Sequence, residues 1–171
     1  MNKIVITGPE SSGKTTLFSL LREEYDTCGV EEYARVYIDQ LDSDYGYNDI
    51  LEIAKGQIVN EKNALEKGGL FMLADTDLLT LELWCEYKYQ KCHHFIKSNL
   101  RKRLPDLYLL CFPDIPWEFD PQRENPNDRL ALFEIYERKI KSIGVDYQIL
   151  RGDKPDRLKS AKTIINRIAN S

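Results

Sequence analysis

The stretch Gly-Pro-Glu-Ser-Ser-Gly-Lys-Thr-Thr, residues 8–16, decides the fold of this chain. It follows a short apolar run, residues 4–7, and precedes leucines at helical spacing, so a strand enters the stretch and a helix leaves it. The stretch fits the pattern G-x-x-x-x-G-K-[ST]. Its glycines allow backbone angles that a side chain would forbid, so successive N–H groups can surround an anion at the helix N-terminus. The sequence therefore predicts a loop that binds phosphate.

The predicted loop divides its tasks between backbone and side chains. Lys14 places a positive charge near the β- and γ-phosphates of a nucleotide and is a predicted catalytic residue. The hydroxyl of Thr15 is a predicted ligand of Mg²⁺. We expect these loop residues to bind the nucleotide: Gly8, Glu10, Ser11, Ser12, Gly13, Lys14, Thr15 and Thr16.

The composition is typical of one globular domain, which we expect to span residues 1–171. Hydrophobic residues make up 42 % of the chain, enough for a sizeable core. The net charge of −4 provides no basic surface, so a nucleic-acid partner is not expected. No apolar run is long enough to span a membrane, and a strand begins at once where a signal peptide would lie. Four cysteines without close pairing complete the prediction of a cytoplasmic protein.

The order of the elements predicts an α/β fold. Strands are expected at residues 4–7, 27–31, 70–74, 107–112 and 147–150, and helices at 15–25, 48–67, 77–89, 94–103, 129–143 and 159–169. The helix that Asn48 caps carries Leu51, Ala54, Ile58 and Leu65 on one stripe. Alternating strands and helices indicate three layers, with a mostly parallel five-stranded sheet between helices on both faces. Ligands of such sheets bind at the carboxyl ends of the strands.

Two acidic clusters follow predicted strands. Glu32, within the run Glu31–Arg35, can accept the proton of an attacking hydroxyl or bind sugar hydroxyls. Asp75 directly follows a buried strand, which is the position of a carboxylate that holds Mg²⁺ or its water. Asp77 is expected to cap the next helix instead. Either Glu32 or Asp75 is the predicted catalytic base.

The segment of residues 113–128 is expected to form a lid. A loop of this length between a strand and a helix is more often a binding loop than a plain connection. Closure excludes water from a phosphoryl group in transfer, and Arg123 or Arg129 can stabilise its oxygens. Trp117 in the lid, or Trp84 outside it, can stack on a flat and even cationic ring.

Two other motifs argue for different chemistry and are weaker. Asp153-Lys154-Pro155-Asp156 is similar to the guanine-reading N-K-x-D, but its first residue is Asp and no D-x-x-G follows the third strand. The same segment can instead wrap an adenine ring, with Arg157 nearby. Cys92-His93-His94 with Cys85 fits no standard zinc spacing.

Taken in order, these clusters resemble the ribosylnicotinamide kinase domain of bacterial NadR-type proteins over almost the whole chain. The resemblance rests on G-P-E-S-S-G-K-T-T (8–16), E-Y-A-R (32–35), A-K-G-Q (54–57), D-T-D (75–77), Trp84, P-D-x-P-W (113–117), Asp120, Arg123 and Arg129. It implies a P-loop kinase that uses ATP and Mg²⁺ to phosphorylate the 5′-hydroxyl of nicotinamide riboside, giving nicotinamide mononucleotide. NadR-type proteins also carry an adenylyltransferase domain, so a chain without one would need a separate enzyme to make NAD.

The resemblance also implies roles for individual residues. Lys14, Glu32, Asp75 and Arg123 are the expected catalytic set, Thr15 and Asp75 the metal ligands, and Arg129 a further nucleotide contact. The nucleoside is expected to contact Glu32, Tyr33, Arg35, Gln57, Asp75, Trp84, Asp114 and Trp117. Val36 stands where many relatives carry an acid, which leaves the network on the ribose side open.

Two alternatives stay open at this point. Another nucleoside or small metabolite is a possible acceptor, since thymidine or uridine needs an amide to read the base edge and Gln57 offers one. A P-loop ATPase or switch would transfer phosphate only to water and would need a partner-binding surface. The lid arginines argue against that alternative. Neither the oligomeric state nor a protein partner follows from the sequence.

Overall fold

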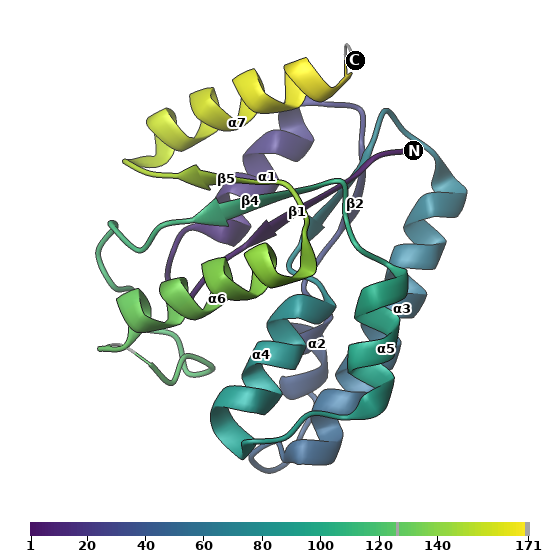
Figure 1. Ribbon diagram of the computed structural model, residues 1–171, viewed down its shortest axis with the longest axis vertical. Coiled ribbons are helices and arrows are strands. Elements are labelled where there is room, and N and C mark those ends of the chain that lie inside the picture. Colours follow the sequence, from purple (N-terminus) through teal and green to yellow (C-terminus); the bar gives the residue numbers. More distant parts are fainter. Residues whose placement is uncertain (126, 170–171) are drawn as a thin grey trace.

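A computed structural model describes residues 1–125 and 127–169 of the chain. Five strands form one sheet: β1 (Lys3–Thr7), β2 (Cys28–Val30), β3 (Met72–Asp75), β4 (Leu107–Cys111) and β5 (Tyr147–Leu150). Their order is β2-β3-β1-β4-β5, and every neighbouring pair is parallel (Figure 1). The helices are α1 (Lys14–Glu24), α2 (Tyr33–Ile38), α3 (Tyr47–Lys67), α4 (Leu78–Tyr89), α5 (His94–Lys102), α6 (Arg129–Ile143) and α7 (Lys154–Ala169). Residue 126 of the predicted lid, and residues 170 and 171 of the predicted domain, lie outside this description.

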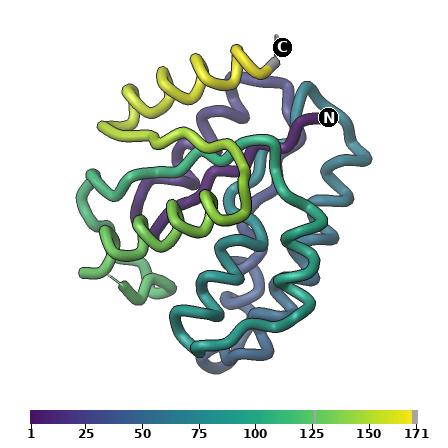
Figure 2. Tube along the Cα trace, viewed as in Figure 1, coloured from purple at the N-terminus to yellow at the C-terminus, as the bar shows by residue number. Residues whose placement is uncertain are grey.

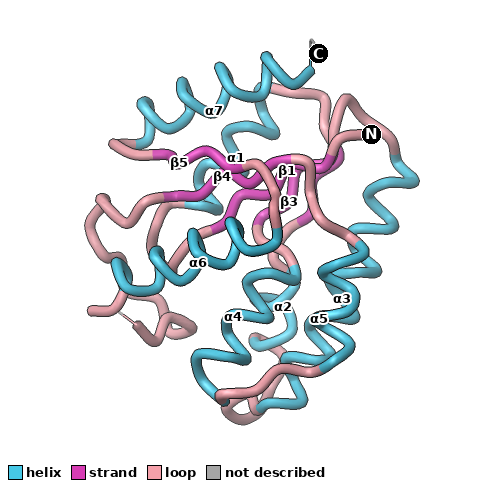
Figure 3. Tube along the Cα trace, in the orientation of Figure 1, coloured by secondary structure: helices cyan, strands magenta, loops and turns pink. Residues whose placement is uncertain are grey.

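Helices cover both faces of the sheet, so the predicted three-layer α/β fold is confirmed (Figure 3). Successive residues of β1 point to opposite faces, as the strand period requires. Ile4 and Ile6 join the core between the sheet, α1 and α7, while Val5 joins the core beneath α3, α4, α5 and α6. The Cα trace in Figure 2 shows α7 and the segment from α2 to α5 on opposite sides of β1.

The strand register brings the polar ends of three strands together. Ile6 of β1 lies beside Asp75 of β3, and Thr7 lies beside Leu110 of β4. The loop after Thr7 therefore begins between the ends of β3 and β4. No described helix is both long and apolar enough to cross a membrane.

Three helices differ from the sequence predictions, and one of them, α2, lies where no helix was predicted. The buried face of α3 includes Gln57 and Glu61, whereas Leu65 of the predicted stripe is 43 % exposed. Glu61 is buried because it pairs with Lys3 of β1, with Nζ and Oε1 2.9 Å apart. The last helix begins at Lys154 rather than at residue 159, because Asp153 Oδ1 accepts a hydrogen bond from the Asp156 N–H, 3.1 Å away. Polar contacts thus explain both the early start of α7 and the two polar residues on the buried face of α3.

Asp77 serves the structure, as predicted. Its Oδ1 accepts a hydrogen bond from the Leu79 N–H at 3.0 Å and so caps α4. Its Oδ2 accepts another from the Tyr108 hydroxyl at 2.8 Å, and the residue is buried. Asp77 therefore joins α4 to β4 beneath the site.

We expect Asp77→Ala to lower the free energy of unfolding by about 2–4 kcal/mol, because a helix cap and a buried hydrogen bond are lost together. Asp77→Asn is the matched control, since its amide oxygen keeps the cap. Urea denaturation measures both variants. Equal losses for alanine and asparagine would show that the two hydrogen bonds do not stabilise the fold.

Candidate active site

The loop of residues 8–16 has the backbone that its glycines predict. Gly8 has a φ of +134°, and a Cβ there would lie 2.7 Å from the carbonyl oxygen of Cys111. Gly13 has a φ of +78° and precedes the first residue of α1. Both the left-handed angles and the close approach to β4 therefore require glycine. Ser11 also has a positive φ, +50°, which is strained for a residue with a side chain.

The loop carbonyls are hydrogen-bonded around its rim. Pro9 O accepts from Ser12 Oγ at 2.7 Å and from Lys14 Nζ at 2.8 Å. Ser11 O accepts from Arg129 Nη1 at 3.1 Å, and the same nitrogen donates to Ile115 O at 2.9 Å. Arg129 thus holds the loop and the start of the lid from outside. Loop carbonyls that are engaged in this way leave the N–H groups free to face an anion.

Two carboxylates, Asp75 buried and Glu32 half-buried, lie beside the loop. Asp75 is 2 % exposed, and its Oδ1 has no hydrogen-bond partner. Burial raises the pKa of Asp75, while Lys14 and the hydroxyl of Thr15 act against that rise. Burial also raises the pKa of Glu32, the charge of Asp75 raises it further, and Lys14 and Arg35 lower it. The two acids therefore repel each other across the site, with Lys14 as the shared cation.

The structure separates the two glutamates that follow β2. Glu31 forms a surface ion pair with Arg22, 3.3 Å between Oε1 and Nη1, and its side chain is 75 % exposed. The side chain of Glu32 is 22 % exposed and lies 3.5 Å from Arg35 Nε. Glu32 faces the site because it immediately precedes α2, which begins at Tyr33. Of the two glutamates, Glu31 thus lies on the surface and Glu32 belongs to the site.

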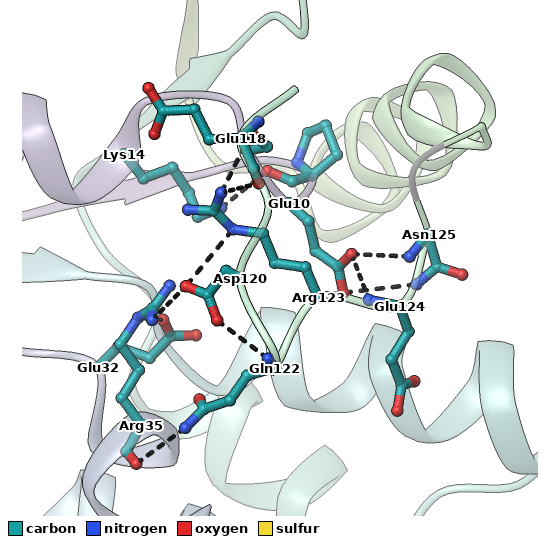
Figure 4. A network of polar contacts seen from close by, with 12 residues as sticks. Glu10, Lys14, Glu32, Arg35, Glu118, Asp120, Gln122, Arg123, Glu124 and Asn125 are labelled. Carbon is teal, nitrogen blue, oxygen red and sulfur yellow. Dashed lines mark hydrogen bonds and ion pairs between the residues drawn. The ribbon is translucent and has the colours of Figure 1, made fainter. Parts of the chain in front are cut away.

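The lid contacts the loop through Glu10 (Figure 4) and through Ser11. The Glu10 carboxylate accepts hydrogen bonds from the backbone N–H groups of Glu124 and Asn125, at 3.0 and 2.9 Å. Ser11 Oγ accepts from the Glu118 N–H at 2.9 Å and from Arg123 Nη1 at 3.3 Å. The described residues of the predicted lid therefore contact the phosphate-binding loop.

Asp120 connects the lid to α2 (Figure 4). Its Oδ2 is 2.9 Å from Arg35 Nη1 and 3.8 Å from Arg123 Nε, so one carboxylate pairs with both arginines. Gln122 adds a hydrogen bond from its Nε2 to Asp39 Oδ1, 2.6 Å away. The neighbouring guanidinium of Arg35 and a backbone N–H hold the pKa of Asp120 below its usual range, the hydrogen bond from the Gln122 N–H being the larger cause. Asp120 is thus ionised at neutral pH.

A cavity of about 190 Å³ opens beneath the lid. One water needs roughly 10–15 Å³ on this measure, so the space suits an organic molecule. One end consists of the phosphate-binding loop, and the other of α2, α4, α6 and the lid. Among the predicted residues, the structure brings together all eight of the loop with Glu32, Arg35, Trp84 and Arg123 on its wall.

Other predicted residues lie off the cavity wall. Tyr33 packs its ring against Gly56, and its N–H donates to Gln57 Oε1 at 3.0 Å. Asp114 pairs with Arg157 and accepts from the Gly152 N–H at 2.8 Å. Trp117 has the guanidinium groups of Arg123 and Arg129 6.0 and 5.8 Å from its ring centre. Asp75 is buried at the end of β3 beside the Thr15 hydroxyl and does not line the cavity. Among these predicted residues, four support neighbouring elements rather than form the cavity surface: Tyr33, Gln57, Asp114 and Trp117.

Sequence reasoning missed most of the apolar wall. These lining residues were not predicted: Pro9, Ala34, Ile38, Thr80, Leu83, Tyr87, Ile115, Glu118, Gln122, Asn125, Leu132, Ile135 and Tyr136. The signal for some of them is present in α4, where Thr80, Leu83, Trp84 and Tyr87 recur at intervals of three and four on one helical face. The α6 residues follow the lid at similar spacing.

The two weaker motifs have structural tasks in the part of the chain that is described. Asp153 caps α7, so the segment similar to N-K-x-D forms the start of a helix. His93 stacks on Tyr47 with ring centres 3.9 Å apart. Within residues 1–125 and 127–169, no three His, Cys, Asp or Glu residues are arranged to hold a metal. Thr15 and Asp75 supply one hydroxyl and one carboxylate, a set that fits Mg²⁺ only together with phosphate oxygens.

Comparisons with known proteins agree with the fold and the loop. Two trifunctional NAD biosynthesis/regulator proteins NadR are similar: that of Salmonella typhimurium is 27 % identical over 150 residues, and that of Escherichia coli K12 is 30 % identical over 124 residues. The matches cover 84 % and 70 % of this chain but only 37 % and 30 % of the relatives' length. The predicted resemblance to NadR-type proteins is therefore confirmed.

Solved structures share the architecture. A NadR protein in complex with NR superposes with a TM-score of 0.82 at 19 % identity, over 99 % of this chain and 51 % of that chain. A NadR protein in complex with NAD and AMP-PNP gives the same score and identity, over 99 % and 50 %. The thymidylate kinase from Ehrlichia chaffeensis gives 0.62 at 13 % identity, over 98 % and 97 %.

One family model, described as an AAA domain, matches residues 3–157. This range begins with β1, includes the phosphate-binding loop, the acids and the lid, and ends in the first turns of α7. The chain therefore belongs to the AAA domain family.

Proposed function

We propose that the protein is a kinase that transfers the γ-phosphoryl group of ATP to the 5′-hydroxyl of nicotinamide riboside, with nicotinamide mononucleotide as product. Support comes from the phosphate-binding loop, from the lid contacts and from the similarity to NadR proteins, with solved structures in complex with NR and in complex with NAD and AMP-PNP. The chain spans about a third of the NadR sequences that it matches, so no other activity of those proteins is transferred to it.

The proposal rests on the charges at the acceptor end of the cavity, which is the end formed by α2, α4, α6 and the lid. Of the described cavity residues, the only cations outside the loop are Arg35 and Arg123: Arg35 pairs with Asp120, and Arg123, which contacts both Asp120 and Ser11 Oγ of the loop, is left for the phosphates of ATP. A nucleotide acceptor brings a phosphate that needs an available cation. A nucleoside needs none. The cavity therefore favours a nucleoside over a nucleotide such as the acceptor of a thymidylate kinase, whose fold it shares.

The acceptor end also suits a cationic ring. Trp84 and Tyr87 lie three residues apart on α4 and both line the cavity. Aromatic faces attract cations, and the carboxylate of Glu32 lies on the same cavity wall. The nicotinamide ring of the riboside is a pyridinium cation. Gln57, the amide that kept thymidine and uridine open, is not among the residues that line the cavity, and its Oε1 accepts a hydrogen bond from the Tyr33 N–H.

We assign the catalytic base to Glu32 rather than to Asp75. Glu32 lines the cavity, whereas Asp75 is buried and is not among the lining residues. In the proposed step, the 5′-hydroxyl gives its proton to Glu32 as its oxygen attacks the γ-phosphorus in line with the departing ADP oxygen. Lys14 and Arg123 stabilise the charge on the transferring group, and the loop N–H groups hold the phosphates.

The residues around Asp75 fit Mg²⁺. The buried Asp75 Oδ1 lacks a partner, and the Thr15 hydroxyl lies beside the same carboxylate. We propose that Thr15 and Asp75 hold the ion, directly or through its water. Bound there, Mg²⁺ would neutralise charge on the β- and γ-phosphates. The four cysteines are free, and we propose that the protein works in the reducing cytoplasm.

A panel of acceptors tests the assignment. ADP release from Mg·ATP is measured without an acceptor, and with nicotinamide riboside, nicotinamide mononucleotide, thymidine, uridine or thymidylate. We expect strong stimulation by nicotinamide riboside, and little by the two phosphorylated compounds. Stimulation by thymidylate but by no nucleoside would contradict the argument from the paired arginines. Equal turnover in every reaction would indicate an ATPase or a switch.

A further inference from the structure

Arg157 is a buried cation with an unusual position. It lies in the early part of α7, where the helix dipole disfavours positive charge, yet it is only 3 % exposed. Buried arginines are rare unless their donors are satisfied. The reason for its burial must therefore lie in its partners and not in the helix.

Its guanidinium group binds three segments at once. Nε donates to Gly152 O at 2.8 Å, Nη2 donates to Phe112 O at 2.7 Å and pairs with the Asp114 carboxylate, and Nη1 donates to Ser12 O. These partners follow β5, β4 and β1, which are neighbours in the sheet. Arg157 thus links the phosphate-binding loop to the start of the lid and to the loop before α7.

Asp114 closes this arrangement. One carboxylate oxygen pairs with Arg157, and the other accepts from the Gly152 N–H at 2.8 Å. The aspartate therefore fixes the guanidinium against the same loop that Arg157 itself contacts. A lysine cannot reproduce these contacts, because an ammonium group lacks the planar fork of donors.

We propose that Arg157 is a positioning residue of the phosphate site, which holds the Ser12 peptide with its N–H side turned toward the phosphates. The C=O of Ser12 and the N–H of Gly13 belong to one trans peptide and point in opposite directions. With Ser12 O held by Arg157, the Gly13 N–H faces away from α7. Arg129 holds the preceding peptide in the same way, through Ser11 O. The inference rests on the proposed nucleotide site but not on the identity of the acceptor.

Binding of two probes tests the role. Arg157→Lys is titrated by calorimetry with Mg·ATP and with inorganic tripolyphosphate, which has no base or ribose. We expect the dissociation constants of both probes to rise about tenfold or more, since a charge-assisted hydrogen bond to the loop is lost. The KM for nicotinamide riboside should stay unchanged. Arg101→Lys on α5, an exposed arginine, is the matched control and should bind both probes like the wild type.

If Arg157 only stabilised the fold, Arg157→Lys would give a different pattern. The melting temperature and the fraction of active protein would fall, but the dissociation constants of the folded fraction would stay unchanged. Asp114→Asn keeps the arginine and removes its charged partner, so we expect a smaller loss of about threefold that adds nothing to Arg157→Lys. Unchanged tripolyphosphate binding by Arg157→Lys would overturn the inference. Failure of the wild type itself to bind either probe would instead overturn the proposed nucleotide site.

Discussion

Lys14→Ala is expected to reduce phosphoryl transfer by about a thousandfold or more, because the charge that faces the transferring group is lost. The fold should remain, since the only described hydrogen bond of the Lys14 ammonium group is to Pro9 O within the same loop. We expect the melting temperature to stay close to that of the wild type. Steady-state rates with Mg·ATP and nicotinamide riboside measure the loss.

Lys55→Ala is the matched control for this variant. Lys55 lies on α3 and pairs on the surface with Glu52, 2.7 Å between Nζ and Oε1. Exposed pairs of this kind contribute little to stability. The control should therefore keep both its rate and its melting temperature. An unchanged rate in Lys14→Ala would remove the loop from the reaction.

Asp75→Asn is expected to lose activity and gain stability. Activity falls, by about a hundredfold or more, because an amide cannot hold Mg²⁺ as a carboxylate does. Stability rises at neutral pH because burial raises the pKa of Asp75, and its charge raises the pKa of Glu32. A buried charge that is destabilising in the folded protein is thus removed.

The raised pKa of Asp75 also determines whether the stability of the protein rises or falls with pH. A carboxyl group whose pKa is raised by folding stabilises the protein below its ordinary pKa, 3.8 for Asp75, and that contribution is lost as the pH rises through the raised value. The wild type should therefore lose stability on going from mildly acidic to neutral pH, and Asp75→Asn should lose less. Thermal unfolding from pH 3.8 up to neutral pH measures both slopes. Glu31→Gln, an exposed neighbour, should keep the wild-type slope. A lower melting temperature for Asp75→Asn at neutral pH would show that the carboxylate is stabilised by its neighbours.

Local sequence patterns were sufficient for the parts of the fold that depend on local physics. The helix at residues 129–143 has the predicted ends, because Gly144 takes the left-handed angle, φ +72°, at its C-terminus. The loop of residues 8–16 likewise depends on its own glycines. Hydrophobic spacing placed Ala54 and Ile58 of α3 against the core correctly, but it could not predict the burial of Glu61, which depends on the distant Lys3.

The site residues divide in the same way, between those that follow from local sequence and those that depend on distant contacts. Glu32 and Asp75 were predicted because they follow strands, and strand ends meet at one edge of a parallel sheet. Asp114 was expected to contact the nucleoside, but the structure pairs it with Arg157, 43 residues away. Contacts such as Glu10 with Asn125, 115 residues apart, depend on how the lid lies over the loop. No periodicity in the sequence encodes such contacts.

The product of the reaction is the most direct test of the central proposal. The protein is incubated with Mg·ATP and nicotinamide riboside, and the products are identified by phosphorus NMR and mass spectrometry. We predict nicotinamide mononucleotide phosphorylated at the 5′ position, formed in a one-to-one ratio with ADP and absent with Lys14→Ala. ADP accompanied by inorganic phosphate, with the riboside unchanged, would contradict the account.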